Sequence, residues 1–169
     1  TVLATKRDVM HPEDTGYTLE GLGDPSGDLV HRLYPPHALR SMLKVCDFVV
    51  VCVPRTPATL NLLGAEELAV LKPSACLVDI SRGGIVDQAA LIPLLRERKL
   101  AGAALDVFPT EPLPADSPLW KLPNVIITPH VAGFSPHYDE RAAALFAENL
   151  HRYLAGLPLY NRLQLDKGY

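Results

Sequence analysis

The sequence contains no apolar run long enough to span a membrane, and its N-terminus lacks the basic-then-apolar pattern of a secretory signal. It also contains no run of lysine or arginine, and its net charge is −3. A charge of that sign and size provides no basic surface for binding phosphate backbones. These absences predict a protein that binds neither nucleic acid nor a membrane.

Cysteine is scarce as well, with only Cys46, Cys52 and Cys76 in the chain. Their spacing matches no zinc site, and an odd number of cysteines cannot be fully paired. All three lie in or beside apolar runs, as expected for buried thiols in a reducing compartment. We therefore expect free, buried cysteines, no bound metal and a cytoplasmic protein.

The sequence does contain short apolar runs that alternate with helical segments, over 169 residues of ordinary globular composition. Strands alternating with helices predict an α/β fold with a doubly wound, Rossmann-like parallel sheet. The unbroken apolar run FVVVCV further predicts a strand that is buried on both faces. We expect strands at 1–5, 29–33, 48–53, 75–80, 102–108 and 124–128, and helices at 35–46, 65–71, 87–98 and 135–154, with Pro93 kinking the third helix or delaying its start.

Arg82 follows the second of the longer apolar strands, expected at 75–80, in the motif SRGGIVD. Ligands of open parallel sheets bind beyond the carboxyl ends of the strands, so Arg82 is expected on the binding rim. Its guanidinium can hold a carboxylate through two parallel hydrogen bonds. Gly83 and Gly84 would let the backbone turn sharply there. Taken alone, the motif is better explained as a surface arginine beside a glycine turn.

Glu111 and His130 follow the next two expected strands, in DVFPTEP and ITPH. An imidazole can accept a hydroxyl proton and return it near neutral pH. A carboxylate beside it would fix the tautomer and favour the imidazolium. The other five histidines lack such a context and are interpreted as surface residues. The three groups together suggest redox chemistry on a small hydroxy acid.

An acid within an apolar strand and a glycine-containing segment near the N-terminus are further candidates for ligand binding. Asp106 lies inside an apolar strand, and a buried acid needs a partner, either a cofactor group or a hydrogen bond to the backbone. The segment GLGDPSG, with Gly21, Gly23 and Gly27, superficially resembles a phosphate-binding loop. No apolar strand leads into it and no helix start follows, so we interpret it as an ordinary loop.

With these residues in view, the chain resembles the C-terminal half of the D-isomer-specific 2-hydroxyacid dehydrogenases, from about Pro35 onward. The resemblance rests on four segments in the same order: DFVVVCVPRTPATLNLLG, LKPSACLVDISRGGIVDQAAL, LAGAALDVFPTEPLPADSPLW and LPNVIITPHVAG. It implies hydride transfer between a nicotinamide and a 2-hydroxy or 2-keto acid, with Arg82 binding substrate, His130 acting as acid and base, and Glu111 as its partner. It also implies that the dinucleotide lies along Val53, Pro54, Thr59, Ile80, Asp106 and Gly133.

The chain departs from the family pattern at three places. The glycine-rich fingerprint, with the strand before it and the helix after it, is absent, so the expected dinucleotide-binding domain at 1–134 is incomplete. Lys6 and Arg7 stand where NAD-dependent members have an acid, so NADP is an alternative to NAD. Asp79 replaces an asparagine that is common before the arginine motif.

The resemblance implies that residues 135–169 form an interdomain helix and tail that return to a substrate domain outside this sequence. It further implies a homodimer, or association with the missing N-terminal half. Removing the central fingerprint strand would leave two sheet edges unpaired, so we expect a truncated chain or part of a longer protein. A second interpretation is a non-catalytic remnant that serves dinucleotide sensing or protein association.

Overall fold

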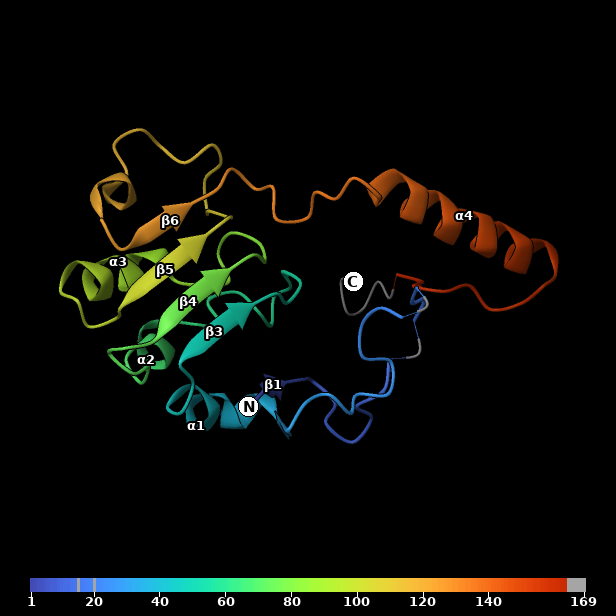
Figure 1. Cartoon of the computed structure of the whole chain (residues 1–169), viewed down its shortest axis with the longest axis horizontal. Coiled ribbons are helices and arrows are strands. Elements are labelled where there is room, and N and C mark those ends of the chain that lie inside the picture. Colours follow the sequence, from blue (N-terminus) through green and yellow to red (C-terminus); the bar gives the residue numbers. More distant parts are fainter. Residues whose placement is uncertain (15, 20, 164–169) are drawn as a thin grey trace.

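The computed structural model describes residues 1–14, 16–19 and 21–163. All of its strands are parallel and form two sheets, one of two strands and one of four (Figure 1). The four-stranded sheet with its helices confirms the predicted Rossmann-like α/β fold. The smaller sheet pairs β1 (Leu3–Thr5) with β2 (Arg32–Tyr34), and the larger has the order β3 (Phe48–Val51), β4 (Cys76–Asp79), β5 (Gly102–Leu105) and β6 (Val125–Ile127).

The helices lie close to where the sequence predicts them, except for the short 3-10 helix at Pro118–Lys121, which was not predicted. In α3 the Asp87 side chain accepts hydrogen bonds from the first free amides, as expected of a helix cap. Pro93 does not delay the start of this helix, which begins at Gln88. The strands are shorter than predicted, and β2 begins at Arg32 rather than Leu29. The helices are η1 (Pro36–Ala38), α1 (Leu39–Leu43), α2 (Ala65–Leu68), α3 (Gln88–Arg96), η2 (Pro118–Lys121) and α4 (Tyr138–Leu154).

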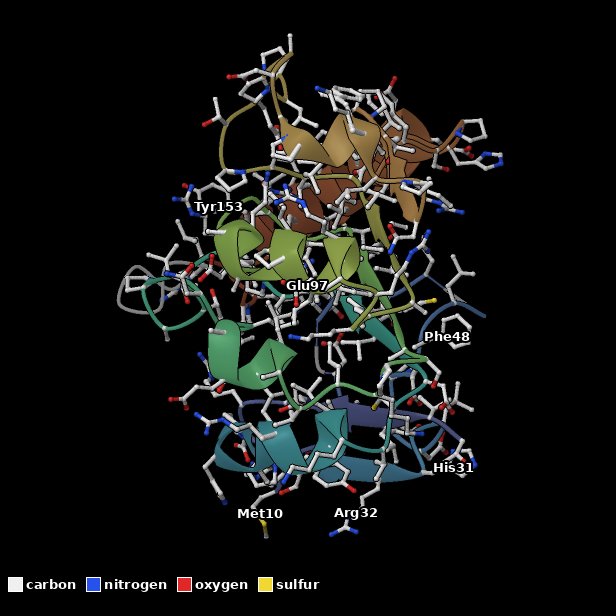
Figure 2. All side chains as sticks on the ribbon, turned by 90° about the vertical axis from the view of Figure 1, so that its left-hand side faces the viewer. Met10, His31, Arg32, Phe48, Glu97 and Tyr153 are labelled. Atoms are coloured by element: carbon white, nitrogen blue, oxygen red, sulfur yellow. The ribbon has the colours of Figure 1, made fainter. Side chains whose placement is uncertain are left out.

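The hydrophobic core lies on one face of the four-stranded sheet, beneath α1, α2 and α3. Along β3, Val49 and Val51 are buried in it, whereas Phe48 and Val50 are 72% and 56% exposed. Figure 2 shows Phe48 on the side of the sheet away from these helices. The prediction of a strand buried on both faces is therefore wrong. Burial of both faces needs helices on both, and within the described residues the second face carries none.

Helix α4 stands apart from the larger sheet, and none of its residues is buried (Figure 1). Its expected apolar stripe is present but open to solvent, with Phe146 and Tyr153 both about 70% exposed.

The long connection between β1 and β2 reaches the segment after α4, where the Tyr17 amide donates to Asn161 at 3.2 Å. The glycines of GLGDPSG lie in this connection, which contains no helix or strand among its described residues. Among the described residues, no helix is long and apolar enough to cross a membrane.

Candidate active site

The parallel strands of the larger sheet place three chemically active side chains beyond one edge. Arg82 follows β4, Glu111 follows β5 and His130 follows β6. Because β4, β5 and β6 are neighbours in register, their carboxyl ends lie side by side. The topology therefore gathers all three residues at the rim where ligands of such sheets bind.

Glu111 and His130 form a direct pair. Nδ1 of His130 lies 2.8 Å from Oε2 of Glu111, and both side chains are partly exposed. The other oxygen of Glu111 accepts the amide of Phe108 at 2.9 Å. The hydrogen bond from His130, followed by that from Phe108, holds the pKa of Glu111 below its ordinary value. With Nδ1 engaged by a carboxylate, Nε2 is the nitrogen that can face a ligand.

The turn that carries His130 is held in place by the side chain of Asp106, which is only 3% exposed. One carboxylate oxygen accepts the Thr128 hydroxyl at 2.5 Å and the Val131 amide at 2.9 Å, and the other accepts the Ala132 amide at 2.9 Å. Burial alone would raise the pKa of Asp106, but these three bonds outweigh it and lower the pKa. The buried acid is thus satisfied by the chain itself, and these bonds hold His130 in its left-handed conformation, φ 56°.

A second buried acid fixes the turn that carries Arg82. Oδ1 of Asp79 accepts both the amide and the hydroxyl of Ser81, at 3.1 and 2.5 Å. Burial raises the pKa of Asp79, and the bonds from Ser81 oppose that rise. An asparagine oxygen could accept the same two bonds, which accounts for the exchange of one residue for the other here. Arg82 in turn donates to the carbonyl of Ser81 at 2.7 Å.

The Arg82 turn packs directly against the loop that leads to Glu111. A Cβ built on Gly83 would lie 1.9 Å from the carbonyl oxygen of Phe108. The next residue, Gly84, has φ 88°, which side-chain-bearing residues rarely adopt. Gly84 thus provides the turn that SRGGIVD predicts, whereas Gly83 serves close packing against the backbone of Phe108, which the sequence did not predict. Through Phe108, the Arg82 turn and the Glu111 loop form one packed unit.

Replacing Gly83 by alanine is expected to lower the free energy of unfolding by about 2 kcal/mol, because backbone must move to admit the methyl group. Urea unfolding of the 169-residue chain measures the change. Gly133→Ala is the matched control, since its Cβ would meet nothing within 4 Å. Equal stability of the two variants would contradict the close packing described.

A cavity of about 540 Å³ opens at the carboxyl ends of β3 and β4. Such a volume is within the range of small-molecule sites. Cys52 is one of its lining residues and is exposed, while Cys46 and Cys76 are only partly buried, so the prediction of three buried cysteines is wrong. The sequence reasoning also missed Arg55, although an arginine just beyond a buried strand end is a signal for anion binding. The cavity is lined by Cys52, Val53, Pro54, Arg55, Ile80, Ser81 and Arg82.

This cavity could hold one end of a dinucleotide, since apolar strand ends and two arginines line it. Thr59 lies nearby but is engaged internally, with its hydroxyl donating to the Pro54 carbonyl at 2.7 Å. Gly133 follows the His130 turn, and a Cβ built on it would meet no atom within 4 Å. Within the described residues, no cluster of three or more histidine, cysteine or acidic side chains could hold a metal ion.

Lys6 and Arg7 lie elsewhere, just after β1 in the smaller sheet. The ammonium of Lys6 donates to the carbonyls of Pro12 and Glu13 at 2.8 and 3.1 Å, so it holds the loop that follows. The structure thus joins Val53, Pro54, Ile80 and Arg82 in one cavity, pairs Glu111 with His130, and leaves Lys6 and Arg7 outside both groups.

Comparison with known proteins matches residues 24–132 to the NAD binding domain of the D-isomer specific 2-hydroxyacid dehydrogenases. A glyoxylate reductase of Korarchaeum cryptofilum is 46% identical over 118 residues, which are 70% of this chain and 36% of that protein. A D-isomer specific 2-hydroxyacid dehydrogenase of Xanthobacter autotrophicus, solved with NADPH and MES, gives a TM-score of 0.80 at 39% identity, covering 99% of this chain and 62% of the other. An NADPH-dependent glyoxylate/hydroxypyruvate reductase of Sinorhizobium meliloti, solved with NADP and sulfate, gives 0.77 at 30% identity, covering 99% and 49%. The chain belongs to the D-isomer specific 2-hydroxyacid dehydrogenase family and carries the NAD-binding part of its fold.

Proposed function

We propose that this chain is the cofactor-domain part of an NAD(P)-dependent oxidoreductase that interconverts a D-2-hydroxy acid and its 2-keto acid. The observation that carries the proposal is the 2.8 Å pair of His130 and Glu111 on the rim that Arg82 shares. Glyoxylate and hydroxypyruvate, named for two of the relatives, define the substrate class: small acids with a carbonyl beside the carboxylate.

Each of the three residues has one task in this reaction. The Arg82 guanidinium binds the substrate carboxylate, and its planar fork fixes the reacting carbon. During oxidation Nε2 of His130 accepts the hydroxyl proton while the carbon–hydrogen pair of electrons leaves as hydride, so a C=O bond forms. Glu111 holds Nδ1–H and stabilises the imidazolium that results. A bound nicotinamide would supply the hydride acceptor. The residues that would lie along the dinucleotide are Val53, Pro54, Thr59, Ile80, Asp106 and Gly133.

The direct test measures cofactor binding and turnover separately. NADH and NADPH are titrated against the purified chain by fluorescence, and oxidation of each is then followed with glyoxylate and hydroxypyruvate. Cofactor binding with turnover supports the proposal. Binding without turnover favours a non-catalytic role in dinucleotide sensing or protein association. Binding of neither cofactor contradicts present dehydrogenase activity in this chain.

We further propose a preference for NADP, carried by the positive charge after β1. An arginine can pair bidentately with the 2′-phosphate that distinguishes NADP from NAD. Because a guanidinium can bind a phosphate bidentately and an ammonium cannot, Arg7 is the better candidate. Arg7→Ala is expected to weaken NADPH binding about tenfold and to leave NADH binding unchanged. Equal losses for both cofactors would show that Arg7 does not contact the 2′-phosphate.

The match covers only 36% of the length of the curated glyoxylate reductase. The domain organisation of a complete enzyme is therefore also a proposal. We assign residues 1–134 to the dinucleotide-binding domain and 135–169 to a segment that returns to a substrate domain; residues 164–169 lie outside the described structure. The open apolar stripe of α4 supports such an association, whether in a homodimer or with an N-terminal half. Three free cysteines support a cytoplasmic site of action.

A further inference from the structure

Two arginines from separate segments line the cavity beyond β3 and β4, which are neighbouring strands in Figure 1. Arg82 belongs to the turn after β4, and its Nη1 donates to the Ser81 carbonyl at 2.7 Å. Arg55 follows β3. A Cβ built on Gly84 would lie 4.0 Å from both Nε and Nη2 of Arg55, so this guanidinium lies beside the turn that carries Arg82. Both guanidinium groups therefore border one turn of the chain.

The positive charges of these two arginines are not balanced within the described part of the chain. Neither of them forms an ion pair with a described acidic side chain. The carboxylate of Asp79 is only 3% exposed and accepts its hydrogen bonds from Ser81. Like charges in one cleft repel each other and attract anions. The rest of the cavity wall carries no charge and consists of Cys52, Val53, Pro54, Ile80 and Ser81.

The two guanidinium groups fit a ligand with two carboxylates. Each guanidinium can bind one carboxylate through two parallel hydrogen bonds, and the charges then cancel. A hydroxy acid with a phosphate ester would bring a total charge of about −3 and leave part of it unmatched. The diphosphate of a dinucleotide is held in doubly wound sheets by main-chain amides at a helix N-terminus, so it does not require a second arginine here.

We propose that Arg55 is a specificity-determining residue that binds a second carboxylate of the substrate. The inference rests on the proposed function, in which Arg82 binds the carboxylate beside the reacting carbon. Because both guanidinium groups border the same turn, the two carboxylates belong to one short molecule. The substrate class is then a short 2-hydroxy dicarboxylic acid and its 2-keto counterpart, which narrows the class of small 2-hydroxy acids.

The test compares two acids of similar size on the isotope-labelled 169-residue chain. D-Malate has a carboxylate where D-2-hydroxybutyrate has a methyl group. Each acid is titrated separately, and NMR follows the Nε–Hε signals of the arginines. We expect D-malate to bind about tenfold more tightly and to shift the signals of Arg55 and Arg82, whereas D-2-hydroxybutyrate shifts that of Arg82 alone. Equal affinities, or failure of D-malate to bind, would overturn the proposal.

Three leucine variants separate the two arginines from a general effect of charge. Arg55→Leu is expected to weaken D-malate binding about tenfold and to leave D-2-hydroxybutyrate binding near that of the parent chain. Arg82→Leu should weaken the binding of both acids. Arg96→Leu is the matched control, because it removes the same charge from an exposed position in the last turn of α3 and should change neither affinity. Equal weakening by Arg55→Leu and Arg96→Leu would contradict a direct contact with Arg55.

Two further titrations distinguish other anions. Tighter binding of D-3-phosphoglycerate than of D-malate would assign a phosphate to Arg55 and overturn the second carboxylate. Weakening of NADPH binding by Arg55→Leu to the same degree as D-malate binding would assign Arg55 to the cofactor. Affinity is measured here without turnover, so the two proposals fail separately. A dehydrogenase that binds both acids equally contradicts only the role of Arg55, and selective binding without turnover contradicts only the proposed reaction.

Discussion

Replacing His130 by alanine is expected to reduce kcat of the active enzyme by about 10²–10⁴-fold, the usual contribution of a positioned general acid or base. Cofactor affinity should change little, because the imidazole acts on the substrate hydroxyl. The measurement is steady-state oxidation of NAD(P)H with glyoxylate, alongside fluorescence titration of the cofactor. Turnover near that of the parent enzyme would remove His130 from the proton-transfer role.

A second histidine–glutamate pair in the same chain provides the control. Nδ1 of His137 lies 3.4 Å from Glu140, and both side chains are well exposed just before and within the start of α4. His137→Ala removes an imidazole of the same chemistry away from the strand ends, so its kcat should stay unchanged. Glu111→Gln keeps the shape of its side chain but can no longer stabilise the imidazolium, so we expect an intermediate loss of kcat. Equal losses for the two histidine variants would indicate a general effect on folding.

The sequence predicts the sheet well because the information is local. Each strand of the larger sheet is a short apolar run that ends at a turn residue, and Asp87 marks the start of α3. Parallel order then follows from alternation with helices. The same reasoning places Arg82, Glu111 and His130 at one rim, since residues after neighbouring parallel strands share an edge.

The parts that the sequence did not predict depend on contacts between distant segments. An apolar strand looks the same whether one face or both are covered, so the exposure of Phe48 and Val50 could not be read from FVVVCV. Likewise, the sequence did not show whether the Asp106 side chain binds a cofactor group or the backbone. Its actual partners, Thr128 and two amides beyond it, are more than 20 residues away. Only the fold shows that a strand acid fixes the histidine turn.

Asp106→Ala should have a large effect on the chain itself, independent of catalysis. Removing the carboxylate leaves the Thr128 hydroxyl and the amides of Val131 and Ala132 without their acceptor, so we expect the free energy of unfolding near neutral pH to fall by about 2–4 kcal/mol. The exposed Asp116→Ala is the control and should lose little.

The pH dependence of that loss identifies its cause. The pKa of Asp106 is lowered from 3.8 in the folded chain, so its carboxylate stabilises the fold above pH 3.8 and progressively less as pH falls through the lowered value. The difference in urea unfolding between the parent and Asp106→Ala should therefore shrink in acid. A difference that is the same in acid as at neutral pH would mean that the lost stability comes from packing, and that the charged hydrogen bonds do not fix the His130 turn.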